Sequence, residues 1–393
     1  MFINKTTGTM KRKILAVTGS RAEYGLLLPV LEKLVESESL ELLLIVTGAH
    51  LLPKYGNTVQ EIIKDGFPVK TIQMYRSSDD SLSERSLAFA RGVRGFTKLA
   101  GRIKPDFVLL LGDRIEPFSA AIASAMLGVP IAHIHGGDTS DCGQIDDSIR
   151  HSISKFASIH FAASKKSAER LRKMGEMPWR IFNVGSPGLD AVLRHNIASK
   201  EAIFKELDLD PDKTTMLCLQ HSVTLEKDDA KRQMSETIEA IKEAGLQTVV
   251  IYPNNDPGSA DVISVIESSR NIPNIRIVRN LEHVKFISLM KFASVMIGNS
   301  SSGVTESASF KLPSISIGTR QTGRECAKNV LFVGHNKKEI IGAIRNALHG
   351  NKFKKALRSC RNPYGDGHAS ERIVEVLEKI PINLSLMRKR ISY

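Results

Sequence analysis

The chain has few cysteines, and none of them stands in a paired motif. Its 393 residues contain Cys142, Cys218, Cys326 and Cys360, and no two of these form a CxxC spacing. A disulfide-stapled scaffold and a zinc ribbon both need closely spaced cysteine pairs, so the sequence disfavours both. Unpaired, scattered cysteines are typical of a reducing compartment, and we therefore expect the cytoplasm.

Long apolar runs are also missing. The longest uncharged apolar stretch, residues 117–132, contains Gly128 and Pro130 and is shorter than the roughly 20 residues that a transmembrane helix needs. The first apolar run, residues 14–17, is too short for the core of a signal peptide. The sequence thus predicts neither a membrane span nor a secretory leader, and it indicates a flexible N-terminal extension over residues 1–12.

Two glycine-rich nucleotide motifs are absent. The chain contains no GxGxxG and no GxxxxGK[ST] segment, which disfavours a dehydrogenase and a P-loop enzyme. His133 and His135 share a face of a predicted strand, but no three potential ligands around them have a familiar metal-binding spacing. We therefore expect no redox cofactor and no metal.

Positive charge, by contrast, is in excess. Fifty-five Lys and Arg against 42 Asp and Glu leave a net charge of +13, which suits a nucleic acid, an anionic membrane or a phosphate-bearing small molecule. Basic residues cluster at 165–173 and 388–390, but no RNA-binding aromatic signature or finger motif accompanies them. We interpret these clusters as solvated helix faces and expect no nucleic-acid or membrane partner. A non-enzymatic binder of either is the alternative, which a salt-sensitive gel shift would support.

Short β runs alternate with helical periods along the chain, a pattern typical of βαβ units with parallel sheets. The predicted strands cover residues 13–18, 40–47, 106–111, 130–135, 158–163, 215–220, 247–252, 275–278, 294–297, 313–317 and 330–333. The predicted helices cover residues 22–36, 116–127, 146–157, 226–244, 258–269, 283–292, 301–310 and 369–380. We expect an N-terminal domain over 13–200, a second domain over 201–368, and a C-terminal helix with a basic tail over 369–393.

The residues that follow the predicted strands carry the functional prediction, because ligands bind beyond the carboxyl ends of parallel strands. Arg21 stands after a Gly-Ser turn at a predicted helix start, which suits an anion. Asp113, Arg114 and Glu116 follow the strand at 106–111, where helix capping by Asp113 with Glu116 is the structural alternative.

Two further carboxylates belong to the same half of the chain. Asp138 follows the strand at 130–135, and Asp147 opens the next helix. We expect them to converge with Glu116 on one sheet edge, where mutual repulsion can raise carboxylate pKa values into a range useful for acid–base chemistry.

The second half of the chain offers a loop that suits a diphosphate. His221 ends one predicted strand, and a Gly-Asn-Ser-Ser-Ser-Gly loop at 298–303 opens a helix after another. Hydroxyls and free N–H groups in such a loop can bind phosphate oxygens, although a helix N-cap is the simpler explanation for one serine. Arg320 and Arg324 follow the next strand.

Together these motifs resemble the hydrolysing UDP-N-acetylglucosamine 2-epimerases of sialic-acid biosynthesis. The resemblance covers residues 13–335 and rests on GSRAEYG (19–25), GDRIE (112–116), HIHGGD (133–138), IDDSIRH (145–151), QHSVT (220–224), PNNDPGS (253–259), GNSSSG (298–303) and GTRQTGRE (318–325). It implies an α/β fold with two Rossmann-like domains facing a central cleft, the GT-B architecture. It also implies a homodimer or a higher homo-oligomer.

The resemblance implies a reaction without a cofactor. A base removes the proton on sugar carbon 2, UDP leaves from carbon 1, and water adds to the resulting 2-acetamidoglucal, which gives N-acetylmannosamine and UDP. By motif position the implied catalytic residues are Glu116, Asp138, Asp147 and His221. The implied substrate- and UDP-binding residues are Arg21, Asp113, Arg114, Asn254, Asp256, Ser300, Ser301, Ser302, Gly303, Glu306 and Arg320.

One departure from the family pattern keeps the substrate open. Members of the family often carry Glu where this chain has Asp138, and a carboxylate displaced by about 1 Å can cost roughly 100-fold in rate. The alternatives are the same reaction on a UDP- or GDP-linked 2,4-diacetamido-2,4,6-trideoxyhexose, and a non-hydrolysing 2-epimerase. A glycosyltransferase on the same scaffold is less favoured, because many transferases of this fold have fewer carboxylates in the first half.

Overall fold

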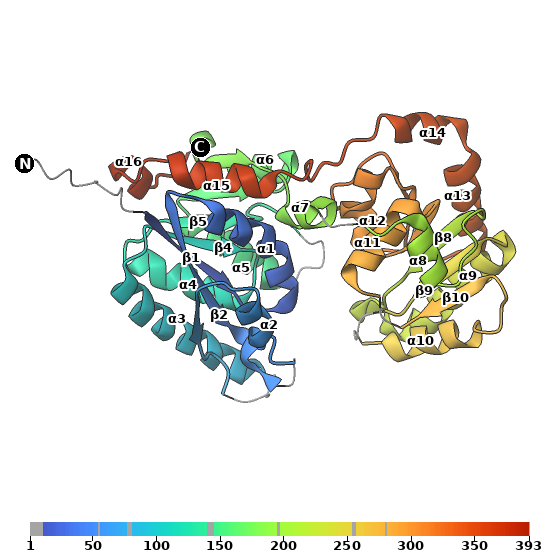
Figure 1. Cartoon of the computed structure of the whole chain (residues 1–393), viewed down its shortest axis with the longest axis horizontal. Helices are drawn as coiled ribbons and strands as arrows, with labels where there is room; N and C mark the ends of the chain where they lie inside the picture. The colour runs from blue at the N-terminus through green and yellow to red at the C-terminus, as the bar shows by residue number, and fades with distance from the viewer. Residues whose placement is uncertain are drawn as a thin grey trace, which may run out of the picture. The chain divides into compact units, whose positions relative to one another are not determined.

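The computed structural model describes residues 11–53, 56–76, 81–139, 145–194, 197–253, 257–279 and 281–392. The chain forms two compact units, each drawn in Figure 1. The first comprises Met1–Leu193 and Tyr364–Tyr393, and the second comprises Arg194–Pro363. The C-terminal helix and tail therefore belong to the first unit.

The first unit is built on a seven-stranded parallel sheet with the strand order β3-β2-β1-β4-β5-β6-β7. Its strands are β1 (Arg12–Thr18), β2 (Leu40–Thr47), β3 (Val69–Ile72), β4 (Phe107–Leu111), β5 (Ile131–Ile134), β6 (Ile159–Ala162) and β7 (Ile181–Asn183). The chain order reverses between β1 and β4, which are neighbours in the sheet. Ligands of parallel sheets bind at such a switch point, so the carboxyl ends of β1 and β4 are the place to look for a site.

Helices cover both faces of this sheet. They are α1 (Arg21–Glu36), α2 (Val59–Lys64), α3 (Leu82–Ile103), α4 (Ile115–Met126), α5 (Ile145–Phe156), α6 (Lys165–Lys173), α7 (Pro187–Arg194), α15 (Ala369–Lys379) and α16 (Leu384–Met387), with short 3-10 turns η1 (Gly48–Leu51) and η3 (Pro178–Arg180). Alternate β1 side chains enter two cores, as the period of two in a strand requires. Ile14 packs in the core under α1 and α15, whereas Leu15 packs in the core under α3, α4 and α5 (Figure 1).

The second unit repeats this design with six parallel strands in the order β10-β9-β8-β11-β12-β13. Its strands are β8 (Thr215–Leu219), β9 (Gln247–Ile251), β10 (Ile275–Val278), β11 (Val295–Gly298), β12 (Ser314–Ile317) and β13 (Val330–Val333). Its helices are α8 (Lys200–Glu206), α9 (Ala230–Ala244), α10 (Ser259–Ser268), α11 (His283–Phe292), α12 (Ser302–Thr305), α13 (Lys337–His349) and α14 (Asn351–Arg358), with 3-10 turns η4 (Thr224–Asp229) and η5 (Ser307–Phe310). The order reverses between β8 and β11, so the second switch point lies there.

The predicted fold class, α/β with two Rossmann-like domains, is confirmed, and each predicted strand overlaps an observed one. The continuous helix expected over 301–310 is wrong. The structure has the four-residue α12 there, followed by η5, with Glu306 between them. Serine and glycine are poor helix formers, which explains why regular α-helical structure stops after one turn.

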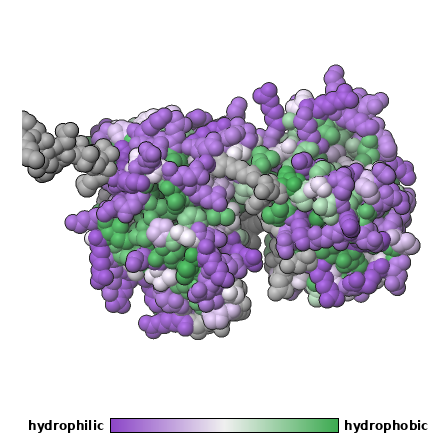
Figure 2. Space-filling view, viewed as in Figure 1, coloured by the Kyte–Doolittle hydropathy of each residue, from purple (hydrophilic) through white to green (hydrophobic). Residues whose placement is uncertain are grey.

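Figure 2 shows hydrophilic side chains over much of the viewed face of each unit. Large apolar side chains with the highest exposure, such as Met126 and Leu225, belong to separate elements. No helix in the described part of the chain has both the length and the apolar character that crossing a bilayer would require.

Candidate active site

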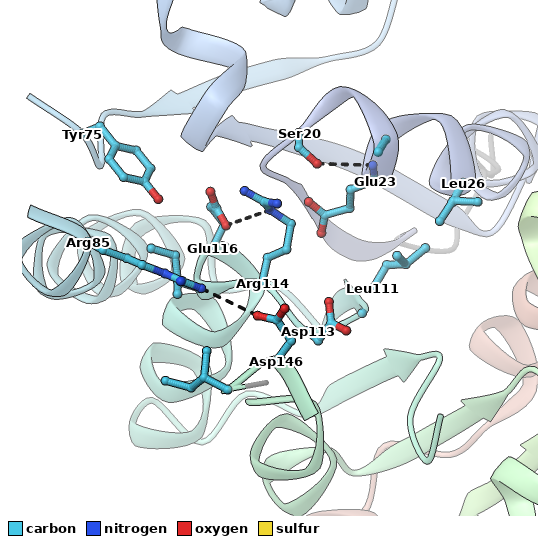
Figure 3. Close-up of a pocket in the computed structure, with 14 residues that line it drawn as sticks. Ser20, Glu23, Leu26, Tyr75, Arg85, Leu111, Asp113, Arg114, Glu116 and Asp146 are labelled. Carbon is cyan, nitrogen blue, oxygen red and sulfur yellow. Dashed lines mark hydrogen bonds and ion pairs between the residues drawn. The ribbon is translucent and has the colours of Figure 1, made fainter. Parts of the chain in front are cut away.

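The switch point of the first sheet opens on a pocket of about 650 Å³ (Figure 3). Polar side chains from the turns after β1 and β4 and from the start of α5 line it. They include Ser20, Glu23, Asp113, Arg114, Glu116 and Asp146. Of the predicted site residues, the pocket thus brings Asp113, Arg114 and Glu116 together.

The start of α1 forms one wall of this pocket. The Ser20 hydroxyl caps the helix by accepting a hydrogen bond from the Glu23 N–H, and the Glu23 carboxylate accepts one from the Gly19 N–H at 2.7 Å. Ser and Glu at this spacing act as a capping box, which fixes where the helix begins. Arg21 is exposed, lies 3.8 Å from Glu61 and does not line the pocket.

Glu116 lines the pocket beside Arg114, and its side chain is fully buried (Figure 3). A Cβ atom at Gly19 would come within 2.6 Å of the Glu116 side chain, and one at Gly48 would collide with its carboxylate, so both positions need glycine. Arg114 Nε lies 3.4 Å from Glu116 Oε2. The proposed capping of α4 by Asp113 is wrong, because the N-cap of that helix is Arg114 and no side chain caps it.

Burial of Glu23 beside Glu116 has an electrostatic consequence. Loss of hydration, and then the negative charge of Glu116, raise the pKa of Glu23 to about 8, although the Gly19 N–H and Arg114 oppose this. Ionising one buried carboxyl next to another is costly, so Glu23 holds its proton at neutral pH. Glu23 belongs to the GSRAEYG motif but is not among the site residues that the sequence predicts.

The raised pKa of Glu23 predicts a pH-dependent stability that Glu23→Gln removes. An ordinary Glu ionises near 4.5 in the unfolded chain but near 8 in this fold, so stability falls as the pH rises through this window. Glutamine can still accept the Gly19 hydrogen bond but cannot ionise. Between pH 5 and pH 8.5 the wild-type Tm is expected to fall by roughly 5 °C more than that of Glu23→Gln.

Thermal melts across this pH range check the prediction. Glu41→Gln, which changes an exposed carboxylate on β2, should retain the wild-type pH dependence. Parallel curves for the wild type and Glu23→Gln would contradict the assignment of the proton to Glu23.

Beside the pocket, the carboxylates of Asp113 and Asp147 both pair with one guanidinium group, that of Arg150. Arg150, on α5, forms ion pairs with Asp113, after β4, and with Asp147, one turn earlier on its own helix at 3.3 Å. The Asp113 and Asp147 side chains are 25% and 22% exposed and so are in contact with solvent, whereas the Glu116 side chain is fully buried. Arg85 on α3 lies 3.7 Å from Asp146 and holds the neighbouring carboxylate of α5 (Figure 3).

Asp138 sits on the turn after β5, outside the lining of this pocket. Its carboxylate accepts a hydrogen bond from the Ser167 hydroxyl at 2.5 Å and lies 3.5 Å from His135 Nδ1. Gly137, with a φ of +78°, makes the turn possible, because a Cβ there would collide with the Ser167 backbone. The expected convergence with Glu116 is thus not seen around this pocket: Asp138 has separate partners.

His133 and His135 have different surroundings. The His133 ring is buried between the Gly112 carbonyl at 2.8 Å and the Ser154 hydroxyl at 3.1 Å, and burial lowers its pKa to about 3. His135 lies beyond the end of β5 with a φ of +64°, so the two rings do not share a strand face. Within the described ranges no three His, Cys, Asp or Glu side chains are grouped to hold a metal.

In the second unit, Asn299 forms hydrogen bonds that connect the turns at the ends of three strands. Its side chain accepts a hydrogen bond from the His221 N–H at 2.7 Å and donates one to the His221 carbonyl at 2.8 Å. Its own carbonyl accepts from Arg320 Nη1 and Gln321 Nε2. This buried amide therefore fixes the turns after β8, β11 and β12, although Asn299 is not among the site residues that the sequence predicts.

The serine-rich loop after β11 contains Ser300, Ser301, Ser302 and Gly303. Ser301 is the N-cap of α12, but its side chain makes no capping hydrogen bond. Glu306 ends this segment, and burial raises the pKa of its carboxyl group. The predicted nucleotide contacts Asn254 and Asp256 lie outside the described residues.

Comparison with known proteins identifies relatives over nearly the whole chain. A family model described as UDP-N-acetylglucosamine 2-epimerase matches residues 32–378. A UDP-N,N'-diacetylbacillosamine 2-epimerase (hydrolyzing) of Legionella pneumophila is 39% identical, covering 98% of this chain and 100% of its own length. A UDP-N-acetylglucosamine 2-epimerase of Neisseria meningitidis is 34% identical over 87% of this chain and 89% of its own. The crystal structure of a UDP-GlcNAc 2-epimerase from Neisseria meningitidis bound to UDP-GlcNAc has the same fold, with a TM-score of 0.76, 20% identity, and coverage of 94% and 100%.

Proposed function

The chain belongs to the UDP-N-acetylglucosamine 2-epimerase family, and on this premise we propose which sugar it takes and how its residues act. It is a hydrolysing nucleotide-sugar 2-epimerase. We propose a UDP-linked 2,4-diacetamido-2,4,6-trideoxyhexose as its preferred substrate. The 39% identity to the diacetylbacillosamine enzyme over 98% of the chain supports this choice, and the 34% identity to a UDP-N-acetylglucosamine enzyme keeps UDP-N-acetylglucosamine as the second candidate.

The chemistry needs a group that removes the proton on sugar carbon 2 and a group that returns a proton to that carbon. When the carbon 2 proton leaves, the bond from carbon 1 to the UDP oxygen breaks and a carbon 1–carbon 2 double bond forms. Water then adds its oxygen to carbon 1, and a proton adds to carbon 2 on the opposite face. Partly exposed carboxylates suit both transfers, because they reach substrate and can gain or lose a proton.

We propose that Asp147 makes one of these two proton transfers and that Asp113 or Asp138 makes the other. All three follow strand ends or open a helix at the same sheet edge, and each is partly exposed, with 25%, 20% and 22% of its side chain accessible. Arg150 orients two of them. The catalytic role predicted for Glu116 stays a prediction, and its full burial favours a role in holding Arg114 rather than contact with the sugar.

We propose that the second unit binds UDP through its switch-point loops. The serine-rich loop at 300–303 and the Arg320 guanidinium offer hydroxyls, backbone N–H groups and a cation to the diphosphate. His221, held by Asn299, would face the reacting sugar, and Glu306 the nucleoside. A cytoplasmic homodimer or larger homo-oligomer is part of the proposal, as is a place in the synthesis of sialic-acid-like sugars.

Substrate profiling with product NMR tests this function. The enzyme is incubated without cofactor with UDP-N-acetylglucosamine and with UDP- and GDP-linked 2,4-diacetamido-2,4,6-trideoxyhexoses, in D₂O. The expected products are free UDP and a free sugar with inverted carbon 2 that carries deuterium there, with the highest kcat/KM for the UDP-linked diacetamido substrate. A mixture of intact UDP-sugars would indicate a non-hydrolysing epimerase, and UDP release only with an acceptor would indicate a transferase.

A further inference from the structure

The end of the chain is held against the first unit by hydrogen bonds and ion pairs, several of them buried. We call residues 380–392 the C-terminal strap. Arg180, which is fully buried, donates hydrogen bonds to the strap carbonyls of Ser385 at 2.7 Å and Leu386 at 2.9 Å, and to the Ser158 carbonyl beneath them. The Ser392 N–H donates to the Gly175 carbonyl at 2.8 Å. The strap thus has a defined position on the described part of this unit.

Lys389 is the strap residue that reaches α5. Its ammonium group donates to the carbonyls of Ser154 at 2.8 Å, Lys155 at 2.9 Å and Ala157 at 2.9 Å. The carbonyls in the last turn of a helix have no partner within the helix, and its C-terminal end carries a partial negative charge. A lysine from a distant part of the chain therefore caps the C-terminal end of α5.

A buried carboxylate holds this lysine in place. Glu176 Oε2 lies 2.7 Å from Lys389 Nζ and accepts a hydrogen bond from His160 Nε2 at 2.9 Å, while Glu176 Oε1 lies 3.1 Å from Lys155 Nζ. Burial opposes ionisation of Glu176, but the hydrogen bonds and charges of His160 and Lys389 outweigh it and lower its pKa to about 2. Glu176 is therefore a permanent anion that fixes the Lys389 ammonium group.

The end of α5 that Lys389 caps is linked to two groups of active-site residues: those at the start of α5 and those on the turn after β4. The first turns of α5 carry Asp147 and Arg150. At its last turn the Ser154 hydroxyl contacts His133 Nδ1, and His133 Nε2 contacts the Gly112 carbonyl, which precedes Asp113. A carbonyl only accepts, so Nε2 carries the proton, and Nδ1 accepts from Ser154. One end of α5 thus supports the turn that presents Asp113.

We propose that Lys389 is a positioning residue for the active site. By capping the end of α5, Lys389 fixes the position of the helix that carries Asp147 and Arg150. Through the contact of Ser154 with His133, it also fixes the turn that carries Asp113. The inference rests on the proposed function in so far as those carboxylates react with the sugar. It also gives a role to one charge of the basic tail, for which the sequence offered only a solvated surface.

Lys389→Met tests the inference, with Arg390→Ala as the matched control, because Arg390 is the next residue and is exposed. A shift of about 1 Å in a catalytic group costs roughly 100-fold. Lys389→Met is therefore expected to lose roughly 10- to 100-fold in kcat, with KM within about threefold of the wild type. Lys389→Arg, which keeps a cation and donors, should restore most of the loss, and Arg390→Ala should match the wild type. An unchanged kcat in Lys389→Met would overturn the proposal.

A double variant separates positioning from simple loss of stability. Lys389→Met leaves Glu176 without its ammonium partner, whereas Lys389→Met/Glu176→Gln removes that uncompensated charge as well. The double variant should regain Tm but not kcat, because the carbonyls at the end of α5 still lack their donor. Recovery of kcat together with Tm would overturn the proposal.

Hydrogen exchange gives a readout that does not depend on the reaction. Amides of α5 and of residues 112–116 should exchange faster in Lys389→Met than in Arg390→Ala, while those of the second unit stay unchanged. If the wild type fails to release UDP, the proposed function is wrong, but exchange still decides the positioning role. Equal exchange in the two variants would overturn that role whatever the activity.

Discussion

Asp147→Asn is expected to lower kcat by roughly 10²- to 10⁴-fold, the range that general acid–base groups contribute, and to leave UDP affinity unchanged. Asp147 is partly exposed and lies 3.3 Å from Arg150 Nη1. Asparagine has the same size and can still accept a hydrogen bond from Arg150, but it cannot take up a proton. Steady-state kinetics by UDP release, with UDP binding by calorimetry, separate the two effects.

Two further variants serve as controls for Asp147→Asn. Asp146→Asn changes the adjacent carboxylate, which pairs with Arg85 at 3.7 Å, and should cost less than about tenfold in kcat. Arg320→Ala should weaken UDP binding more than it alters kcat at saturating substrate, because a group that acts on bound substrate and transition state alike changes mainly KM. If Asp147→Asn kept wild-type turnover, or Asp146→Asn lost as much, Asp147 would not be the proton-transfer group.

The sequence could predict the strands because parallel strands covered on both faces are short apolar runs. The segment at 107–111, for example, is Phe-Val-Leu-Leu-Leu and is buried throughout. The edge strand β3, with the sequence Val-Lys-Thr-Ile, is too short and too polar to give this signal. The long helix α3 also has no clear signal in the sequence, because Gly92, Gly95 and Gly101 interrupt its apolar pattern. Gly92 and Gly95 allow close packing against Met74 and Ile72, which only the folded chain reveals.

The sequence can predict where the site lies, but not which side chains within it are buried or bonded to one another. Residues after strands meet at one sheet edge by topology alone, so Asp113 and Arg114 could be placed beside Glu116. The burial of Glu116 depends on Gly19 and Gly48, which follow other strands. Long-range side-chain partners leave no periodic signal in a single sequence. Asn299, for example, bonds to His221 across 78 positions.

Part of the excess positive charge is internal to the fold. Arg180 is fully buried among backbone carbonyls, and Lys389 is mostly buried among carbonyls and Glu176. Such cations compensate helix ends and buried carboxylates rather than forming a field for an external partner. The net charge of +13 is therefore weaker evidence for a polyanionic partner than the number alone suggests.

Arg150→Met is expected to have the second large effect, a loss of roughly 100-fold or more in kcat together with a Tm lower by several degrees. The Arg150 side chain is only 12% exposed and is the shared ion-pair partner of Asp113 and Asp147. Its removal leaves these two partly buried carboxylates without their shared cation. Each side chain is therefore expected to move, and the uncompensated charge lowers the stability of the fold.

Arg150→Lys distinguishes charge from geometry. Lysine keeps the positive charge and should recover much of the Tm, but a single ammonium group cannot bridge two carboxylates as a planar guanidinium does, so kcat should stay well below the wild type. Arg85→Met is the matched control, since Arg85 lines the pocket and, like Arg150, pairs with a carboxylate of α5, in its case Asp146. Melts and kinetics on the three variants give a direct comparison. Equal losses of kcat in Arg85→Met and Arg150→Met would show that Arg150 has no special role. Full recovery of kcat in Arg150→Lys would show that the two-carboxylate bridge has no part in catalysis.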